Sequence, residues 1–181
     1  MSMAILRTYA FLDRDGTLVA ERSDEQWAGC RAVELLPGVG PALRGLARAG
    51  FSLVVVTNQY PIGEGIVSAE DYAAQAATLL AAAEDQGATL LDVLHCPHPR
   101  WSPCPCAKPA TGMIDEAQRR HGVLDAERSV VVGDSDVDLQ LATAAGIRGC
   151  RVDQAILGEP PPERELARIV EEILEVPPGR A

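Results

Sequence analysis

Hydrophobic residues along this chain form short apolar runs that alternate with stretches of helical spacing. Five runs have the length and composition of buried strands, and they lie at residues 8–12, 51–56, 89–94, 129–132 and, more weakly, 147–152. Amphipathic helices are predicted between and after them, at residues 39–47, 68–86, 112–121, 136–145 and 166–174. The alternation predicts an α/β fold: a Rossmann-like, doubly wound parallel sheet with helices on both faces.

The length and composition of the chain predict a single domain over residues 1–181. The chain has 181 residues, of which 47% are hydrophobic and 23% charged, so one substantial core can form. No apolar run reaches the roughly 18 residues that a membrane span needs, and the apolar stretch near the N-terminus is too short for a signal peptide. We therefore expect a cytoplasmic protein without a membrane partner. A monomer is also expected.

Net charge argues against a nucleic-acid partner. Asp and Glu number 26 against 16 Lys and Arg, which makes the formal charge −10. A chain of this charge does not attract phosphate backbones or anionic membranes, and an aromatic content of 4% provides few surfaces for base stacking. A small molecule is the expected partner, and a phosphorylated one would need a local cation.

Polar residues directly follow the four strongest predicted strands. Asp13 and Asp15 come after the first strand, Thr57 and Asn58 after the second, and Asp134 after the fourth. The third strand leads into a cysteine-rich segment that ends at Lys108. Because parallel strands place their carboxyl ends at one edge of the sheet, these groups are predicted to converge there.

Two clusters of carboxylates at neighbouring strand ends favour a divalent cation. Taken alone, Asp13 and Asp15 could be solvated acids that cap a strand. Asp134, followed one helical turn later by Asp138, adds a second cluster, and the two would repel each other unless a cation lay between them. Mg²⁺ suits this set because it takes a few carboxylate oxygens and leaves positions for water and a phosphate.

A phosphoryl group fits among these residues. Lys108 is the only lysine in a chain with 15 arginines, which suggests that this position needs a compact ammonium group. Thr57 and Asn58 would add neutral hydrogen-bond donors around the phosphoryl oxygens. Asp13 would attack phosphorus, and Asp15 would protonate the leaving oxygen and then activate water.

The cysteine-rich segment predicts a structural zinc site in a loop over residues 95–107. Cys96, His98, Cys104 and Cys106 supply three thiolates and one imidazole between four prolines. This number and kind of ligands suits tetrahedral Zn²⁺ with no open position. The alternative is a loop of reduced cysteines. His95 is left out of the ligand set because it would point the other way from an extended chain.

Four motifs together resemble the haloacid dehalogenase superfamily of phosphohydrolases. They are FLDRDGTL, VVVTNQ, Lys108-Pro109 and VVGDSDVDLQ, and they span residues 8 to 147. The resemblance implies that Asp13 is the nucleophile and Asp15 the acid/base, and that Lys108 steadies Asp13 and the phosphoryl oxygens. It also implies that Thr57 and Asn58 contact the phosphate and the substrate. The implied Mg²⁺ ligands are the side chains of Asp13 and Asp134 and the backbone carbonyl of Asp15. Asp138 is implied to make a supporting contact with Lys108 or with a metal-bound water.

The zinc loop narrows the resemblance to the branch that contains the D-glycero-D-manno-heptose 1,7-bisphosphate 7-phosphatases and the histidinol-phosphate phosphatases. Only twenty residues lie between Gly16 and Pro37, too few for a folded cap domain, so the zinc loop is expected to shape one side of an open site. Removal of the 7-phosphate from the heptose bisphosphate is the first expectation, and histidinol phosphate is the alternative.

Three positions depart from the pattern of the heptose enzymes. Val19, Glu64 and Ala107 stand where that branch usually has an Asn and two Arg residues. Two cations near the sugar are therefore missing, and Arg100 in the zinc loop is the expected substitute as a substrate contact.

Two other functions share parts of this pattern. A phosphatase of nucleic-acid 3′ ends can carry the same motifs, but it would need a basic groove that a charge of −10 does not suggest. A non-catalytic binding protein stabilised by zinc could have the same fold. The expected chemical type at every catalytic position argues against it.

Overall fold

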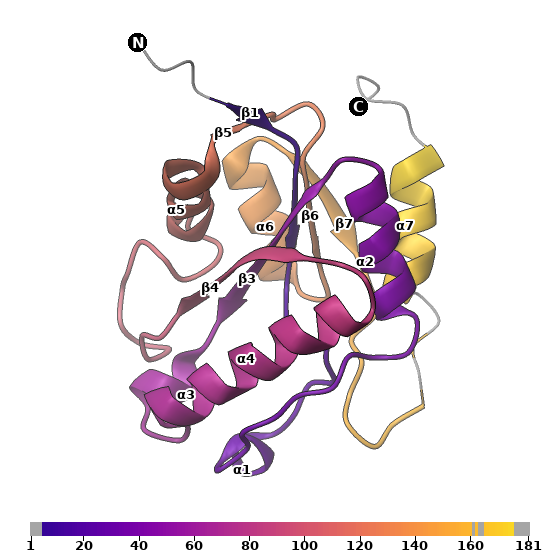
Figure 1. Ribbon diagram of the computed structural model, residues 1–181. Helices are drawn as coiled ribbons and strands as arrows, with labels where there is room; N and C mark the ends of the chain where they lie inside the picture. The colour runs from indigo at the N-terminus through magenta and orange to yellow at the C-terminus, as the bar shows by residue number, and fades with distance from the viewer. Residues whose placement is uncertain (1–4, 161, 163–164, 176–181) are drawn as a thin grey trace.

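Five parallel strands form the central sheet of the computed structural model, which describes residues 5–160, 162 and 165–175. The strand order is β4-β3-β2-β6-β7 (Figure 1). The bounds are β2 Tyr9–Leu12, β3 Ser52–Asn58, β4 Leu90–Cys96, β6 Val130–Gly133 and β7 Arg148–Arg151. All five predicted strands are thus present, and the predicted parallel sheet is confirmed.

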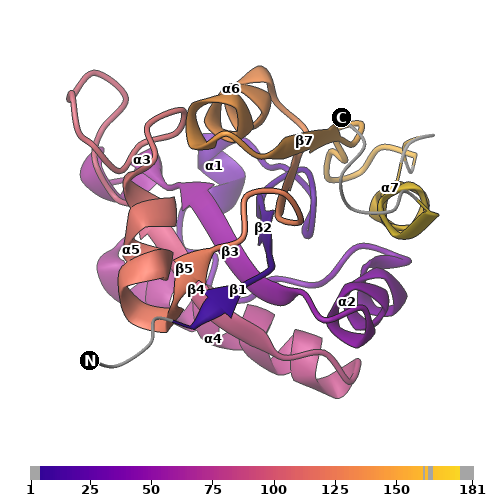
Figure 2. The same ribbon diagram turned by 90° about the horizontal axis from the view of Figure 1, so that it is seen from above.

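Helices cover both faces of this sheet (Figure 2). Three of them, α2 (Val39–Arg48), α4 (Ala69–Asp85) and α7 (Leu166–Glu175), pack on one face. The other face is covered by α5 (Gly112–His121) and α6 (Asp136–Ala145). The five predicted helices are confirmed, with ends within a few residues of the expected ones.

Alternate strand residues enter two separate cores. In β2, Ala10 and Leu12 belong to the core beneath α2, α4 and α7, whereas Tyr9 and Phe11 belong to the core beneath α5 and α6. Burial of both faces explains why these strands appear in the sequence as continuous apolar runs rather than as an alternation of apolar and polar residues.

Four short elements were not predicted from the hydrophobic pattern. Strands β1 (Leu6–Arg7) and β5 (Val123–Leu124) pair in parallel as a separate two-stranded sheet. Helices α1 (Asp24–Trp27) and α3 (Tyr60–Gly63) are single turns near the carboxyl ends of β2 and β3 (Figure 1). Elements of this length are too short to show a period, although the capping box of Ser23 and Gln26 is a readable signal for α1.

The end of the sheet where β2 and β3 finish is not covered by a cap domain. Between Gly16 and Pro37 the only helix is the four-residue α1, as the short spacing predicts. Within the described residues, no helix is both long and apolar enough to cross a bilayer.

Candidate functional site

The predicted site residues converge at the carboxyl ends of the strands. Asp13 follows β2, and its backbone N–H donates to the carbonyl of Val132 in β6 at 2.9 Å, which places two strand ends side by side. An open cleft lies above them. The residues that line it include Asp13, Asp15, Thr57, Asn58, Lys108 and Asp134, together with Glu21, Trp27, Gln59, Tyr60, Pro61, Ser135, Val137 and Gln154.

Lys108 is a buried cation that bridges two carboxylates. Its Nζ lies 2.6 Å from Oδ1 of Asp13 and 2.6 Å from Oδ1 of Asp138, and its side chain is 3% exposed. Burial lowers the pKa of Lys108, but the two carboxylates outweigh this effect and raise the pKa above its ordinary value. The ammonium group therefore stays charged beside Asp13, and Asp138 makes the contact with Lys108 that the family motif implies.

The carboxylates of Asp13, Asp134 and Asp138 form one buried cluster. One oxygen from each lies within 4.8 Å of the others. Asp138 already accepts from Lys108 and from the backbone N–H of Ser135, whereas Asp13 and Asp134 face the cleft. Burial raises the pKa of Asp13 well above its usual range, in spite of the opposing effect of Lys108, and burial also raises the pKa of Asp134.

This donor set fits Mg²⁺. Hard carboxylate oxygens are its preferred protein ligands, and a divalent cation would offset the cost of ionising two buried acids close together. Gly16 keeps the space beside Asp134 open, because a Cβ there would lie 2.7 Å from Oδ2 of Asp134 and the backbone has a φ of +79°.

Thr57 and Asn58 end β3 but serve different purposes. Thr57 is buried at the base of the cleft, where its hydroxyl accepts a hydrogen bond from Gln59 at 2.9 Å. Asn58 uses both ends of its carboxamide on the backbone of Lys108: Oδ1 accepts from N–H at 2.8 Å and Nδ2 donates to the carbonyl at 3.1 Å. Asn58 thus positions Lys108, a role that the motif did not reveal.

Arg100, expected to contact substrate, is engaged in other interactions. Its guanidinium bonds to Glu64 at 3.2 Å and to Asp24 at 2.8 Å, and it lies 3.8 Å from the centre of the Tyr60 ring. The interactions connect the cysteine-rich loop to α1 and α3. Arg100 is not among the residues that line the cleft.

The four predicted zinc ligands are gathered at the end of β4. Nδ1 of His98 lies 3.4 Å from Sγ of Cys96 and 3.2 Å from Sγ of Cys106, and the three sulfurs are 3.2–3.5 Å apart. Tetrahedral Zn²⁺ with bonds of about 2.3 Å would hold sulfurs roughly 3.8 Å apart, so a small expansion accommodates the ion. His95 lies outside the cluster, with its ring 4.3 Å from that of Tyr72.

We predict one equivalent of zinc per chain after purification under reducing conditions, retained through an EDTA treatment that removes Mg²⁺. Four protein ligands leave a chelator no open coordination position. Cys104→Ser should lower the melting temperature by at least about 5 °C, because roughly 2 kcal/mol or more of folding free energy depends on the bound metal. Elemental analysis and thermal denaturation measure both effects.

Cys30→Ser is the matched control, because Cys30 lies outside the cluster and bonds to the backbone of Ala32. Its melting temperature should stay within about 2 °C of the wild type. A protein without zinc, or one with equal losses in the two variants, would contradict the structural zinc site.

Several residues at the cleft were missed from the sequence. Arg14 and Gln59 bond to the side chain of Asp15, and Glu21 and Trp27 line the cleft beside it. An arginine directly after a buried strand, between two acids, was the available signal, because a charged residue at such a position needs partners.

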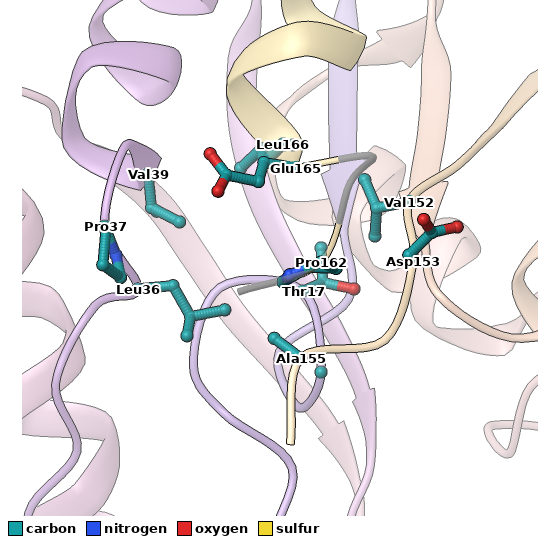
Figure 3. Close-up of a pocket in the computed structure, with 11 residues that line it drawn as sticks. Thr17, Leu36, Pro37, Val39, Val152, Asp153, Ala155, Pro162, Glu165 and Leu166 are labelled. Carbon is teal, nitrogen blue, oxygen red and sulfur yellow. The ribbon is translucent and has the colours of Figure 1, made fainter. Parts of the chain in front are cut away.

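A second pocket lies beside Thr17, which belongs to the loop that follows β2 (Figure 3). Apart from Thr17, Asp153 and Glu165, its side chains are apolar, and they come from two parts of the chain that are far apart in sequence, including Leu36, Val39 and Leu166. None of the predicted site residues lines this pocket, whereas the cleft is lined by Asp13, Asp15, Thr57, Asn58, Lys108 and Asp134.

Sequence comparison relates the chain to metabolic enzymes. The HAD-hydrolase-like family model matches residues 105–175. The chain is 36% identical over 155 residues to D-glycero-beta-D-manno-heptose-1,7-bisphosphate 7-phosphatase of Rhodopseudomonas palustris, covering 81% of this chain and 84% of that protein. It is also 36% identical over 142 residues to the histidine biosynthesis bifunctional protein HisB of Legionella pneumophila, covering 78% of this chain but only 40% of that protein.

Structure comparison agrees with these relatives. D,D-heptose 1,7-bisphosphate phosphatase from B. bronchiseptica, solved with magnesium and phosphate, superposes with a TM-score of 0.78 at 28% identity and covers 93% of this chain and 98% of that one. A HAD-like phosphatase structure from Mesorhizobium loti superposes with a TM-score of 0.74 at 30% identity, covering 92% and 86% of the two chains.

Proposed function

Since this chain belongs to the haloacid dehalogenase-like hydrolase family, we propose that it is a phosphatase that hydrolyses a small phosphomonoester through an aspartyl phosphate. The observation that carries the proposal is the pairing of Asp13 with Lys108 at 2.6 Å, beside Asp134, at the floor of an open cleft. A buried carboxylate with a fixed cation next to it suits nucleophilic attack on a charged phosphoryl group.

Two displacements at phosphorus make up the reaction. In the first, a carboxylate oxygen of Asp13 forms a bond to phosphorus while the ester P–O bond breaks, and Asp15 gives its proton to the leaving oxygen. In the second, Asp15 takes a proton from water as the water oxygen attacks phosphorus, and the bond between Asp13 and phosphorus breaks. Phosphate leaves, and both carboxyl groups return to their starting states.

The surrounding residues stabilise charge on the transferring group. Lys108 neutralises charge on the phosphoryl oxygens, and the hydroxyl of Thr57 is placed at the base of the cleft to donate to one of them. Asp13 and Asp134, with the backbone carbonyl of Asp15, are the groups that would hold Mg²⁺. A bound Mg²⁺ supplies further charge neutralisation for the phosphoryl oxygens.

D-glycero-D-manno-heptose 1,7-bisphosphate, with loss of the 7-phosphate, is the proposed substrate. The relative from R. palustris carries this activity in its name, and the comparison covers 84% of its length. A structural neighbour with the same kind of substrate in its name matches over 93% of this chain. The open cleft, without a cap domain, leaves room for a phosphosugar.

Histidinol phosphate is a second candidate, and the charges of the cleft favour it. Lys108 is the only cation that lines the cleft among the described residues, and Asp13 and Asp138 already pair with it. Glu21 adds an acidic group, whose pKa burial and the nearby Asp15 raise to about 7. A second phosphate on the substrate would find no free cation there, whereas an amine would find a carboxylate.

Hydrolysis of a substrate panel separates these candidates. We expect Mg²⁺-dependent phosphate release with kcat/KM at least about tenfold higher for heptose 1,7-bisphosphate than for histidinol phosphate, a difference of about 1.4 kcal/mol. Both anomers of the bisphosphate are included. A higher kcat/KM for histidinol phosphate would favour the second candidate, and no release from any phosphomonoester would contradict the phosphatase itself.

Residues 1–181 are proposed to act as one hydrolase domain whose zinc loop, residues 95–107, forms a wall beside the cleft. Arg100 supports this arrangement because it connects the loop to α1 and α3. We also propose that the protein is a monomer that works in the cytoplasm. A small molecule rather than nucleic acid is the proposed partner, since the chain carries a formal charge of −10.

A further inference from the structure

Arg14 lies between the two catalytic aspartates in sequence, yet its side chain is buried and is not among those that line the cleft. It is 1% exposed, and its guanidinium lies 4.8 Å from the ring of Trp27 and 5.3 Å from the ring of Tyr72. Nη1 donates to Gln75 at 3.0 Å. A guanidinium enclosed in this way cannot reach a substrate phosphate, so its partners within the protein must explain its burial.

One of those partners is the side chain of Asp15. Nε of Arg14 donates to Oδ1 of Asp15 at 2.8 Å, and Nε2 of Gln59 donates to Oδ2 at 2.6 Å. Nη2 of Arg14 also donates to Oε1 of Gln59 at 3.1 Å. Arg14, Asp15 and Gln59 thus form a closed ring of hydrogen bonds in which each carboxylate oxygen of Asp15 has its own donor.

The ring also settles which way the Gln59 carboxamide points. Its oxygen must face the guanidinium of Arg14, which has donors only, and its NH₂ group must face the carboxylate of Asp15. The same NH₂ group donates to the hydroxyl of Thr57 at 2.9 Å, so Gln59 connects the acid/base to the floor of the cleft. The whole arrangement is anchored on α4 by Gln75, which donates to the carbonyl of Cys30 at 2.9 Å.

We propose that Arg14 and Gln59 are positioning residues that hold Asp15 for proton transfer and make Oδ2 the oxygen that exchanges protons with the leaving group and with water. The inference rests on the proposed phosphatase function and on the acid/base role of Asp15. The donor to Oδ1 is the charged guanidinium of Arg14, which makes the stronger bond, whereas the donor to Oδ2 is the neutral carboxamide of Gln59, whose bond is the weaker one to exchange.

In this arrangement the bond from Arg14 to Oδ1 is kept, while Oδ2 exchanges its bond with Gln59 for one with the reacting oxygen. In the first displacement the proton on Oδ2 passes to the leaving oxygen. In the second, Oδ2 accepts a proton from the attacking water. Without the ring, the Asp15 side chain could adopt other rotamers, and a misplacement of about 1 Å can cost on the order of 10²-fold in rate.

Dependence on the leaving group tests this role. An alkyl phosphate needs a proton on its leaving oxygen, whereas p-nitrophenolate leaves as an anion and does not. We expect Gln59→Met to lower kcat for an alkyl phosphomonoester at least about tenfold with KM within about twofold of the wild type. The rate of the initial nitrophenolate burst with p-nitrophenyl phosphate should fall less than about threefold.

Two further variants complete the experiment. Arg14→Met should show the same selective loss, and Arg14→Lys should recover part of it, since an ammonium keeps the charge beside Oδ1 but loses the fork. Gln118→Met is the matched control: Gln118 lies on α5, away from the cleft, and accepts from the backbone N–H of Leu124. It should change both reactions by less than about twofold.

Equal losses on both substrates, or no loss in Gln59→Met, would overturn the proposed role of Gln59 and of the ring. Circular dichroism checks that each variant is folded. If Arg14→Met is not folded, the result for Gln59→Met alone decides whether the ring positions Asp15. Failure of the proposed function gives a different outcome, because the wild-type enzyme would then show no Mg²⁺-dependent release of nitrophenolate at all.

Discussion

Asp13→Asn is expected to lower Mg²⁺-dependent phosphate release by at least about 10³-fold, which corresponds to about 4 kcal/mol in the barrier. An amide is a poor nucleophile toward phosphorus and a weak ligand for Mg²⁺, so the change removes two functions of one side chain. It also leaves Lys108 with one carboxylate partner, Asp138, in place of two. Steady-state phosphate release with and without Mg²⁺ measures the effect.

Asp136→Asn is the matched control for this experiment. Asp136 begins α6 close to the cleft in sequence, but its side chain is 79% exposed and pairs with Arg151 on the surface. We expect activity within about twofold of the wild type, because an exposed ion pair contributes little. If Asp13→Asn kept a tenth of the wild-type turnover, Asp13 could not be the nucleophile.

Lys108→Arg is expected to lower kcat by at least about 10²-fold while the protein stays folded, a loss comparable to that of one donor to a developing charge. The single Nζ of Lys108 contacts Asp13 and Asp138 at 2.6 Å each in a buried space. A planar guanidinium is wider than an ammonium group and cannot place one nitrogen at both contacts. Initial rates with saturating substrate, and circular dichroism for the fold, measure the two parts of the prediction.

Geometry, rather than charge, is what the Lys108→Arg variant changes. Asn58 holds the backbone of Lys108 through both ends of its carboxamide, so the main chain cannot move to accommodate a larger side chain without breaking those bonds. Lys108→Met removes the charge as well and should be at least as impaired. Near-normal kinetics in Lys108→Arg would show that Lys108 acts only as a distant charge and makes no direct contact with the reacting group.

Much of the fold follows from local patterns in the sequence. The apolar run at residues 51–56 coincides with most of β3, because an unbroken run matches a strand that is buried on both faces. The stripe of Leu166, Ile169, Val170 and Ile173 coincides with α7, because its spacing matches the buried side of a helix. The short elements had no such pattern. Pairing of Thr57 with His95 and of Asn58 with Cys96 extends β4 two residues beyond the predicted end, and that pairing is visible only once the strands are adjacent.

Most of the candidate site could also be predicted. Asp13 and Asp134 follow strands whose carboxyl ends meet at one edge of a parallel sheet, and Lys108 lies in the loop that follows a third such strand. The four candidate zinc ligands lie within eleven positions, and this spacing is itself a local signal. The contacts that Asn58 and Arg100 make within the protein could not be predicted, because they depend on neighbours that are distant in sequence. Those neighbours are the Lys108 backbone for Asn58 and the Glu64 carboxylate for Arg100.

The sequence alone determined the order of strands and helices, the groups able to react at the ends of the strands, and the residues able to bind zinc. Only the tertiary structure decided which of these groups contact one another. The ring of Arg14, Asp15 and Gln59 joins residues up to 45 positions apart, and Lys108 lies 95 positions from Asp13. Hydrophobic periodicity reports the burial of each segment separately, whereas hydrogen bonds between distant side chains depend on the distance and direction that packing gives them.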